Sequence, residues 1–316
     1  NTAAVCREKG AIVYKRFNSE KARKGYALEY LFENISRDYG IESVDGYFVF
    51  DADNLLAPNY VEKMNDAFSQ GNPIVTSYRN TKNFDTNLIS AAYGIHFYHN
   101  SLGKHRPRSV LHLGTHLTGT GYLISSFLLK DGWHYTTFTE DDQITMALSG
   151  EGYKIAYCEE AEFFDEQPVD FKTVFNQRVR WAKGRLTNFF KYGYKAFCGI
   201  FKHKSFTCYD MFAYYFPYGL FTWVIGLVYP VCSFIYGLFN PGTYDYSAMG
   251  TNILLTFGSQ YLYALVSGAL TVIRERKHIR CTPGKLVVYT IMFPWFNLIS
   301  IPVYIVAIFK RVKWTP

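Results

Sequence analysis

The sequence has few cysteines, and none of them is spaced as part of a motif. Six cysteines are scattered over 316 residues, with no C-x-x-C pair and no even series of spacings. A disulfide framework or a zinc site would require such spacing, so both are excluded, and we expect reduced thiols in the cytosol. We find no internal repeat and no low-complexity tract, and we expect no signal peptide within these residues.

Lysine and arginine are absent from residues 240–250, between two long apolar runs. Overall, 33 Lys+Arg against 26 Asp+Glu give a formal net charge of +7, and the excess gathers beside these runs. Basic clusters that flank membrane spans mark the cytoplasmic side, so segment 240–250 is expected to face outward. Membrane adjacency explains the clusters better than nucleic-acid binding does, and we expect no nucleic-acid partner. The clusters are Lys183, Arg185, Lys191, Lys195, Lys202 and Lys204 before the first run, and Arg274, Arg276, Lys277, Arg280 and Lys285 after the second.

The chain divides into two parts of unlike composition. Residues up to about 205 mix charged and apolar residues as a soluble domain does, and from Met211 onward long apolar runs carry few charges. The runs near residues 212–239, 251–273 and 286–309 are candidate membrane spans. The third contains Pro294 and Pro302, so it forms either one crossing or a re-entrant hairpin. A hairpin leaves the basic tail, residues 310–313, in the cytoplasm, and this is the arrangement that we favour.

Strands and helices alternate in the first part, which predicts an α/β fold with a mixed, mostly parallel sheet. Ligands of such sheets bind at the carboxyl ends of the strands. Residues 1–5 have the pattern of the middle of a helix, whereas a βα unit starts with a strand, so we expect an upstream strand to be missing. The expected strands cover residues 11–14, 47–50, 74–78, 117–125 and 154–157, and the expected helices cover 21–39, 59–68, 87–100, 139–148 and 171–192.

Two aspartates follow the apolar stretch 47–50, which is typical of a strand buried on both faces. Asp51 and Asp53 would point apart on an extended segment, but a turn after the strand can converge them. Such a pair suits a hard divalent ion that also holds a diphosphate. An ordinary acidic turn is the plainer alternative, since aspartate is common in turns. The position directly after a buried strand favours the metal site.

A second acidic cluster comprises Thr139, Glu140, Asp141 and Asp142. A threonine cap and carboxylates in the first turn suit the start of a helix, because the helix dipole favours negative charge there. Three consecutive acids exceed what capping needs. One of them could therefore act as a general base, if it reaches an acceptor hydroxyl within hydrogen-bonding distance.

The segment Gln177–Trp181 places three side chains on one face of a helix. Gln177, Arg180 and Trp181 are spaced i, i+3 and i+4. Arginine forks suit phosphate oxygens, and an indole face suits the apolar side of a sugar ring. A basic amphipathic helix lying on a membrane surface is the alternative, and the two are compatible. Arg178 and Val179 fall off this face and are expected to serve packing or the membrane surface.

Three further signals are weaker. Lys24 could place a cation near a nucleotide, although solvated lysines are far commoner. Gly119, Thr120 and Gly121 could let the backbone approach a ligand closely, or form a plain tight turn. His112 and His116 are spaced i, i+4, but Gly114 lies between them and no liganding acid follows, so we expect no metal there.

Together, these motifs resemble the membrane-bound family 2 glycosyltransferases, the group that contains cellulose, chitin and hyaluronan synthases. The matching segments are 51–53, 119–121, 139–141 and 177–181, in the family's order and followed by apolar helices, so the resemblance covers nearly the whole chain. It implies a GT-A fold and an inverting hexosyl- or N-acetylhexosaminyltransferase that uses a nucleotide-diphosphate sugar, with a UDP-sugar expected.

The resemblance also implies a role for each matching residue. Asp51 and Asp53 would hold Mg²⁺ or Mn²⁺ against the diphosphate, where the metal stabilises the leaving group. Asp141 would be the general base that deprotonates the acceptor hydroxyl. The family's more N-terminal aspartate, which contacts the uracil, has no counterpart, in agreement with a missing upstream segment. Substrate binding would fall to Lys24, Gly119, Thr120, Gly121, Glu140, Gln177, Arg180 and Trp181, with Gln177 and Arg180 on the diphosphate and Trp181 as the floor of the acceptor site.

The resulting organisation has three parts. We expect a cytosolic catalytic domain over residues 1–170, interfacial amphipathic helices over 171–208 and two to three plasma-membrane spans over 209–316. The leading hypothesis is a processive synthase that elongates a polysaccharide at the bilayer. One alternative is a non-processive transferase that adds a single sugar to a lipid acceptor, as ceramide glucosyltransferases do. Another is a non-catalytic membrane subunit on a degenerate scaffold.

Overall fold

The computed structural model describes residues 2–18, 20–242 and 245–310. Its strands are β1 (Gly46–Val49), β2 (Leu55–Leu56), β3 (Ile74–Thr81), β4 (Tyr122–Ser125) and β5 (Ile155–Asp165). Its helices in the first part are α1 (Thr2–Glu8), α2 (Lys24–Tyr39), α3 (Tyr60–Ser69), α4 (Leu88–Asn100), α5 (Arg106–Val110) and α6 (Glu140–Gly150). The later helices are α7 (Phe171–Lys202), α8 (Phe206–Tyr215), α9 (Tyr218–Phe239), α10 (Tyr246–Arg274), α11 (Pro283–Leu298) and α12 (Ser300–Phe309).

The described strands form one mixed sheet in the order β1-β4-β3-β5-β2. The α/β fold class with a mixed sheet is confirmed, but the expectation of a mostly parallel sheet is wrong. Among the described strands only β3 and β5 pair in parallel, while β1–β4, β3–β4 and β2–β5 are antiparallel. The reason lies in β4, which enters between β1 and β3 and runs opposite to both.

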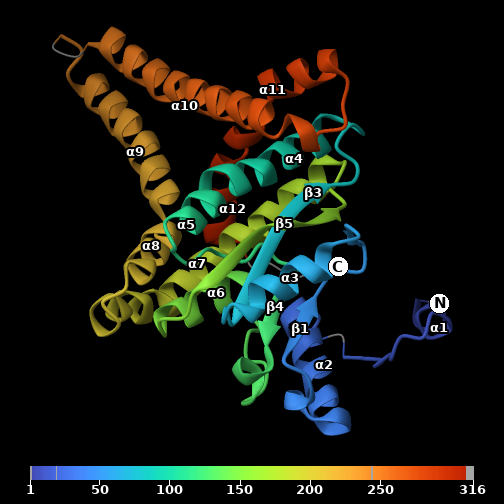
Figure 1. Ribbon diagram of the computed structural model, residues 1–316. Coiled ribbons are helices and arrows are strands. Elements are labelled where there is room, and N and C mark those ends of the chain that lie inside the picture. Colours follow the sequence, from blue (N-terminus) through green and yellow to red (C-terminus); the bar gives the residue numbers. More distant parts are fainter. Residues whose placement is uncertain (1, 19, 243–244, 311–316) are drawn as a thin grey trace.

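The expected strand at residues 11–14 is also wrong. Residues 11–18 have no regular structure, and Ile12 is 66% exposed. A strand needs a neighbouring strand to satisfy its backbone groups, and within the described chain no strand pairs with residues 11–18. Figure 1 shows α1 set apart from the sheet at the end of this extended stretch. The other expected elements are present, although β4 is shorter than expected while β5 and α7 run about ten residues further.

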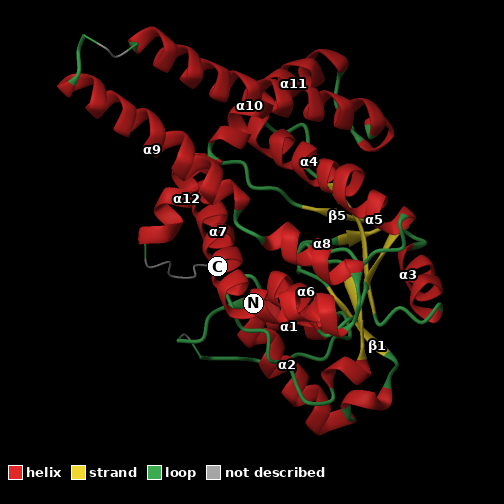
Figure 2. Ribbon diagram, turned by 90° about the vertical axis from the view of Figure 1, so that its left-hand side faces the viewer, coloured by secondary structure: helices red, strands yellow, loops and turns green. Residues whose placement is uncertain are grey.

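Helices lie on both sides of the sheet, with α3 on one side and α6 and α7 on the other (Figure 2). One apolar cluster joins Phe32 of α2 and Ile144 of α6 to the strands. A second joins Tyr60 of α3 to β3 and β5. A third packs α4 against the C-terminal helices, through contacts that include Tyr98 and Phe293. The apolar C-terminal part therefore rests directly on the sheet domain through α4.

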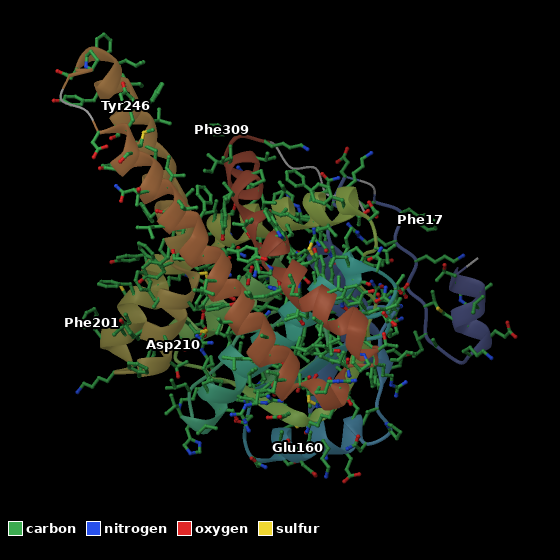
Figure 3. The ribbon with its side chains drawn as sticks, turned by 90° about the horizontal axis from the view of Figure 1, so that it is seen from above. Phe17, Glu160, Phe201, Asp210, Tyr246 and Phe309 are labelled. Atoms are coloured by element: carbon green, nitrogen blue, oxygen red, sulfur yellow. The ribbon has the colours of Figure 1, made fainter. Side chains whose placement is uncertain are left out.

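The C-terminal part is expected to hold two to three spans. Within the described residues, two helical segments are long and apolar enough to cross a membrane, Tyr246–Arg274 and Pro283–Phe309. The run 212–239 is not one helix, because α8 ends at Tyr215 before Pro217 and α9 begins at Tyr218. Between α9 and α10 lies the tip of a hairpin that projects from the body of the molecule, with Tyr246 at its end (Figure 3).

The last apolar run is divided, as its prolines suggested. Helix α11 ends at Leu298 and α12 begins at Ser300, with Pro302 in the first turn, where a missing N–H costs no helical hydrogen bond. Val303 and Ala307 of α12 are buried against Val179 and Ala182 of α7. Whether this run crosses a membrane or turns back stays a prediction, and residues 311–313 of the tail lie outside the described residues.

Candidate functional site

One cavity, of about 420 Å³, gathers most of the residues singled out by the sequence. It lies among the start of α2, the turn after β1, the loop before β4, the start of α6, and one side of α4, α7 and α12. Asp53, Thr120 and Gly121 are not part of its lining. The motif residues that do line it are Lys24, Asp51, Gly119, Glu140, Asp141, Gln177, Arg180 and Trp181.

Lys24 connects three of these motifs. Its Nζ donates to Asp51 Oδ1 at 2.5 Å and to the carbonyl of Gly119 at 2.7 Å. The same Nζ lies 3.8 Å from Glu140 Oε1. Because Lys24 is the first residue of α2, the start of that helix fixes the position of the cation between two acidic segments. Lys24, one of the weaker signals of the sequence, therefore contacts three of the predicted motifs.

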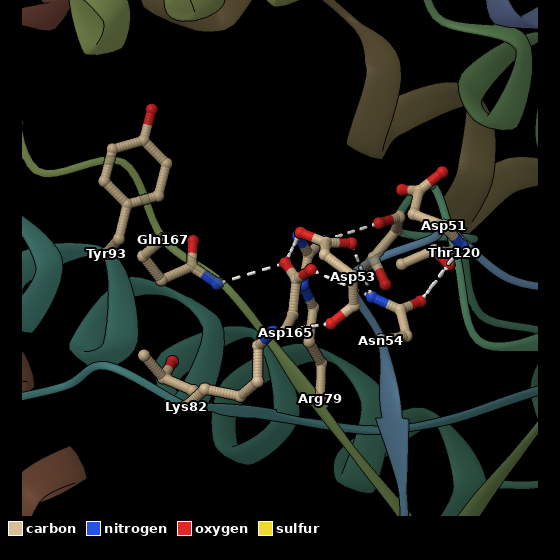
Figure 4. A network of polar contacts seen from close by, with 12 residues as sticks. Asp51, Asp53, Asn54, Arg79, Lys82, Tyr93, Thr120, Asp165 and Gln167 are labelled. Carbon is tan, nitrogen blue, oxygen red and sulfur yellow. Dashed lines mark hydrogen bonds and ion pairs between the residues drawn. The ribbon is translucent and has the colours of Figure 1, made fainter. Parts of the chain in front are cut away.

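The turn after β1 is held by the loop before β4 (Figure 4). Asp51 N–H donates to Thr120 Oγ1 at 2.8 Å, and Thr120 in turn donates to Asn54 Oδ1 at 2.5 Å. Thr120 thus positions the aspartate turn instead of lining the cavity. Asp53 is exposed, and its backbone carbonyl accepts from Lys82 Nζ at 2.7 Å. Desolvation, then the charges of Asp165 and Asp51, raises the pKa of the Asp53 carboxyl.

The aspartate turn fits a divalent cation. Desolvation, and then the negative charges of Asp165 and Asp51, raise the pKa of Asp53, and a bound cation would offset that repulsion. Carboxylate oxygens are the hard ligands that Mg²⁺ prefers, with the remaining ligands coming from water and phosphate. Among the described residues no group of three or more His, Cys, Asp or Glu side chains could hold a metal alone. Metal binding here stays a prediction.

Arg79 and Asp165 were missed by the sequence reasoning. They form an ion pair beneath the aspartate turn, and Asn54 Nδ2 donates to Asp165 Oδ1 at 3.0 Å (Figure 4). Arg79 also donates from Nη1 to the carbonyl of Thr118 at 2.7 Å, and its guanidinium lies 3.7 Å from the centre of the Phe97 ring. The available signal was an arginine within the strand that follows α3, where charge is uncommon unless it is paired.

The acidic cluster forms the first turn of α6. Glu140 is buried, and Asp141 lies on the cavity wall. Burial, then the neighbouring charges of Asp142 and Glu140, raises the pKa of the Asp141 carboxyl well above its usual range. A carboxyl whose pKa moves toward neutrality is better matched to accept a proton from a hydroxyl. This environment is compatible with the predicted base, and the role of Asp141 stays a prediction.

Thr139 occupies the N-cap position of α6, but the expectation that its side chain caps the helix is wrong. Its Oγ1 instead accepts from Asn188 Nδ2 of α7 at 3.0 Å, and its carbonyl accepts from the same nitrogen at 2.9 Å. Gly184 of α7 packs directly on Thr139, since a Cβ at Gly184 would lie 2.4 Å from the threonine oxygen. This contact sets the start of α6 against the helix that carries the Gln177–Trp181 face.

The predicted face of α7 points into the cavity. Gln177 Oε1 accepts from the Tyr93 hydroxyl at 2.7 Å, and Arg180 Nη1 donates to the carbonyl of Phe138 at 3.1 Å. The Trp181 ring meets Tyr93 edge to face, 6.0 Å between centres. Tyr93 therefore braces both the amide and the indole. The helical spacing is confirmed, while the substrate contacts stay predictions.

Arg178 departs from its expected place. It lines the same cavity, donates from Nη1 to the carbonyl of Phe296 at 2.6 Å and lies 4.3 Å from the centre of that ring. Burial lowers the pKa of its guanidinium. The expected position of Arg178 was wrong because α11 and α12 cover this side of α7. A side chain outside the predicted face therefore still reaches the cavity. Val179 packs against α12, as expected.

The two glycines of the loop before β4 serve different purposes. Gly119, at φ +91°, lines the cavity, and a Cβ there would lie 3.7 Å from Asp141 Oδ2. Gly121, at φ +68°, packs on Phe163, whose ring a Cβ would approach to 2.3 Å. Close approach to a ligand is thus open to Gly119, whereas Gly121 is required by packing. His116 also lines the cavity, while His112 does not.

Comparison with known proteins gives a match to one family model and similarity to individual proteins. The model of the family described as glycosyl transferase family group 2 matches residues 48–273. The chain is 27% identical over 132 residues to a probable glycosyltransferase YdaM of Bacillus subtilis, which covers 39% of the chain and 29% of that protein. It is 31% identical over 98 residues to the cellulose synthase A catalytic subunit 9 [UDP-forming] of Oryza sativa subsp. indica, which covers 28% of the chain and 9% of that protein. The matched segments span less than a third of either relative.

Proposed function

Because the chain belongs to glycosyl transferase family group 2, we propose that it moves a sugar, with inversion, from a UDP-sugar to a growing polysaccharide at the membrane. The observation that supports this proposal most directly is the position of Lys24. Its ammonium contacts the aspartate turn, the glycine loop and the start of α6. The similarity to a cellulose synthase subunit supports a polysaccharide product.

The residues of the cavity divide the reaction between them. Lys24 and Arg180 bring positive charge to the diphosphate, and Trp181 offers its ring to the acceptor sugar. When bound at Asp51 and Asp53, Mg²⁺ or Mn²⁺ would neutralise charge that develops on the diphosphate. Asp141 takes the proton of the acceptor hydroxyl as that oxygen bonds to the anomeric carbon. The bond from this carbon to the diphosphate breaks, and its electron pair leaves with the nucleoside diphosphate.

The membrane assignment rests on three features. In the part of the chain that the structure describes, two helical segments are long and apolar enough to cross a bilayer. The basic loop after α10 docks on the sheet domain through Arg106 and Glu275, and Lys285 lies 3.1 Å from Asp85, so loop and site share one side. Because basic loops lie on the cytoplasmic side of a membrane, we place the catalytic part in the cytoplasm and the apolar helices in the plasma membrane. Exposed aromatic residues on α7, namely Phe190, Tyr194, Phe197 and Phe201, suit the bilayer surface.

The test is a screen of nucleotide sugars for release of nucleoside diphosphate by the protein in membranes, with and without Mg²⁺ or Mn²⁺. Asp141→Asn should abolish transfer while leaving nucleotide binding largely intact, because the base acts only in the chemical step. The exposed Asp131→Asn is the matched control and should keep wild-type turnover.

The outcomes separate the hypotheses. No release with any donor would overturn the proposed function, and wild-type turnover by Asp141→Asn would remove Asp141 from its role. Release that ignores chelation of divalent ions would remove the metal. Product length after incubation with labelled donor separates a polysaccharide synthase from a transferase that adds one sugar to a lipid.

A further inference from the structure

Three residues of the cavity lining carry a buried side-chain atom with no hydrogen-bond partner among the described residues, namely Arg79 (Nε), Asn100 (Oδ1) and His116 (Nδ1). The other guanidinium nitrogens of Arg79 are bound to Asp165 and to the carbonyl of Thr118, whereas Asn100 and His116, 6% and 3% exposed, have no charged partner in the described part of the chain. Folded proteins pair nearly all of their buried polar atoms, because an unpaired one loses its bond to water without replacement. Because Asn100 and His116 both line one cavity, a ligand bound there is a candidate for the missing partners.

Asn100 belongs to a wall formed by a single face of α4. Tyr93, His96, Phe97 and Asn100 are spaced i, i+3, i+4 and i+7, and all four line the cavity. Through Phe97, whose ring centre lies 3.7 Å from the Arg79 guanidinium, this wall also packs on the residues beneath the aspartate turn. Its aromatic rings and one free carbonyl oxygen resemble a surface for an uncharged polar ring more than one for a phosphate.

His116 is held in a fixed orientation. Its ring stacks between His105 and Tyr214, with ring centres 4.5 and 4.4 Å apart, and its Nε2 lies 3.1 Å from the Tyr214 hydroxyl. Burial, then the charges of nearby His105 and Lys104, holds the pKa of His116 well below its usual range, so the ring is neutral. Because Tyr214 engages Nε2, the second ring nitrogen is left for a ligand.

The neighbours of His116 connect it to the side of the base. Arg185 donates to the carbonyl of Tyr214 at 2.5 Å, and the hydroxyl of Tyr215 donates to Asp142 Oδ1 at 2.9 Å. Asp142 is adjacent in sequence to Asp141. In an inverting displacement the acceptor arrives on the side of the base, opposite the departing diphosphate. These contacts connect His116 to the side of the cavity that holds the predicted base.

We propose that Asn100 and His116 determine acceptor specificity by binding two hydroxyl groups of the sugar at the acceptor's end. This inference rests on the proposed function and sharpens it, since an acceptor that pairs both atoms ends in a sugar ring. An apolar lipid alcohol has a single hydroxyl and would leave one atom unpaired.

The two nitrogens of His116 can be tested separately. His116→Asn keeps an amide near the position of Nδ1 and loses the bond to Tyr214, whereas His116→Gln keeps reach toward Tyr214 and loses Nδ1. Asn100→Leu removes the free carbonyl in a similar volume. Tyr214→Phe removes only the hydroxyl that braces His116. The acceptors are tetrasaccharides of β-linked glucose and of β-linked N-acetylglucosamine, with donor hydrolysis in their absence as the reference reaction.

His116→Gln and Asn100→Leu should raise the acceptor KM by about tenfold to a hundredfold, the usual effect of one lost buried hydrogen bond. Donor KM and donor hydrolysis should stay unchanged, and His116→Asn should bind acceptor nearly as the wild type does. The inference is overturned if His116→Asn and Tyr214→Phe are the damaging variants, since that marks a structural role. It is also overturned if the donor KM rises instead, or if no variant changes the acceptor KM.

Failure of the proposed function is distinguishable from failure of this inference. If no nucleotide sugar is turned over, binding of the same tetrasaccharides is measured through tryptophan fluorescence, with Trp181 as the reporter at the site. Weaker binding by His116→Gln than by His116→Asn supports the sugar subsite without any catalysis. Equal binding by the two variants overturns it.

Discussion

Replacing Gly121 by alanine tests how the loop before β4 is held in place. An alanine there meets two penalties. Its φ of +68° lies in the left-handed region, which costs a residue with a Cβ about 1–2 kcal/mol. Its Cβ would also lie 2.3 Å from the ring of Phe163, a fully buried residue. Forcing an extra methyl group into a packed core costs about 1–3 kcal/mol, so the total loss of unfolding free energy is about 2–5 kcal/mol.

The chain offers a control that separates the two penalties. Gly71 is exposed and has a φ of +86°, and a Cβ added to it would meet no neighbouring atom within 4 Å. Gly71→Ala should therefore cost only the backbone penalty of about 1–2 kcal/mol. The double variant Gly121→Ala with Phe163→Leu should lose less than the sum of its single variants, because the smaller side chain vacates the contact.

The measurement is guanidinium unfolding in detergent, followed by tryptophan fluorescence, for the four variants. If Gly121→Ala costs no more than Gly71→Ala, the argument from the Phe163 contact is refuted. If the double variant is simply additive, another residue bears the clash. Transfer activity should fall together with stability, because the neighbouring Thr120 receives the Asp51 amide and a shifted loop displaces the aspartate turn.

Two further predictions concern charge. Arg106→Met leaves Glu275, which is fully buried, without its ion-pair partner, and should cost about 3–5 kcal/mol in the same unfolding measurement. Lys63→Met, which breaks an exposed surface pair, should cost less than about 1 kcal/mol, and equal losses would contradict the role of burial. The second prediction is a pH profile: since Asp141 must be ionised to act as a base and its pKa is raised from 3.8, kcat should be lost on acidification at a pH well above 3.8. Asp142→Asn removes a like charge and should move this limb to lower pH, and a limb that stays in place would exclude the coupling.

The motif part of the site was predictable from sequence because its signals are local. Asp51 follows an apolar strand, Asp141 opens a helix, and Gln177, Arg180 and Trp181 share one helical face; each pattern is complete within about five residues. Membership of the glycosyltransferase family, expected from the order of these motifs, is confirmed. The roles of the individual residues stay predictions.

Other parts of the site required contacts between distant segments. Arg79 stands out in the sequence as a charge within a strand, but its partner Asp165 lies 86 positions further along the chain and is identified only by the fold. Asn100 and His116 were identified because each has a buried atom without a hydrogen-bond partner among the described residues, and the sequence alone does not show which atoms are buried or paired. The prediction of a mostly parallel sheet was wrong for a related reason. Strand β4 runs antiparallel to both of its neighbours, and the direction of a strand depends on the path of the chain between elements.

The amino-acid sequence by itself determined the periodic and local features of this protein: the alternation of strands and helices, the acidic turns, the helical face of α7 and the apolar C-terminal runs. Backbone geometry within a few residues is enough to produce each of them. The tertiary structure alone decided which of these features share a cavity. Lys24 reaches Asp51 and Gly119 across 27 and 95 positions of sequence, and α12 covers α7 so that Arg178 joins the site. Such contacts depend on how whole elements pack, and the resulting burial raises the pKa of Asp141 and lowers that of His116.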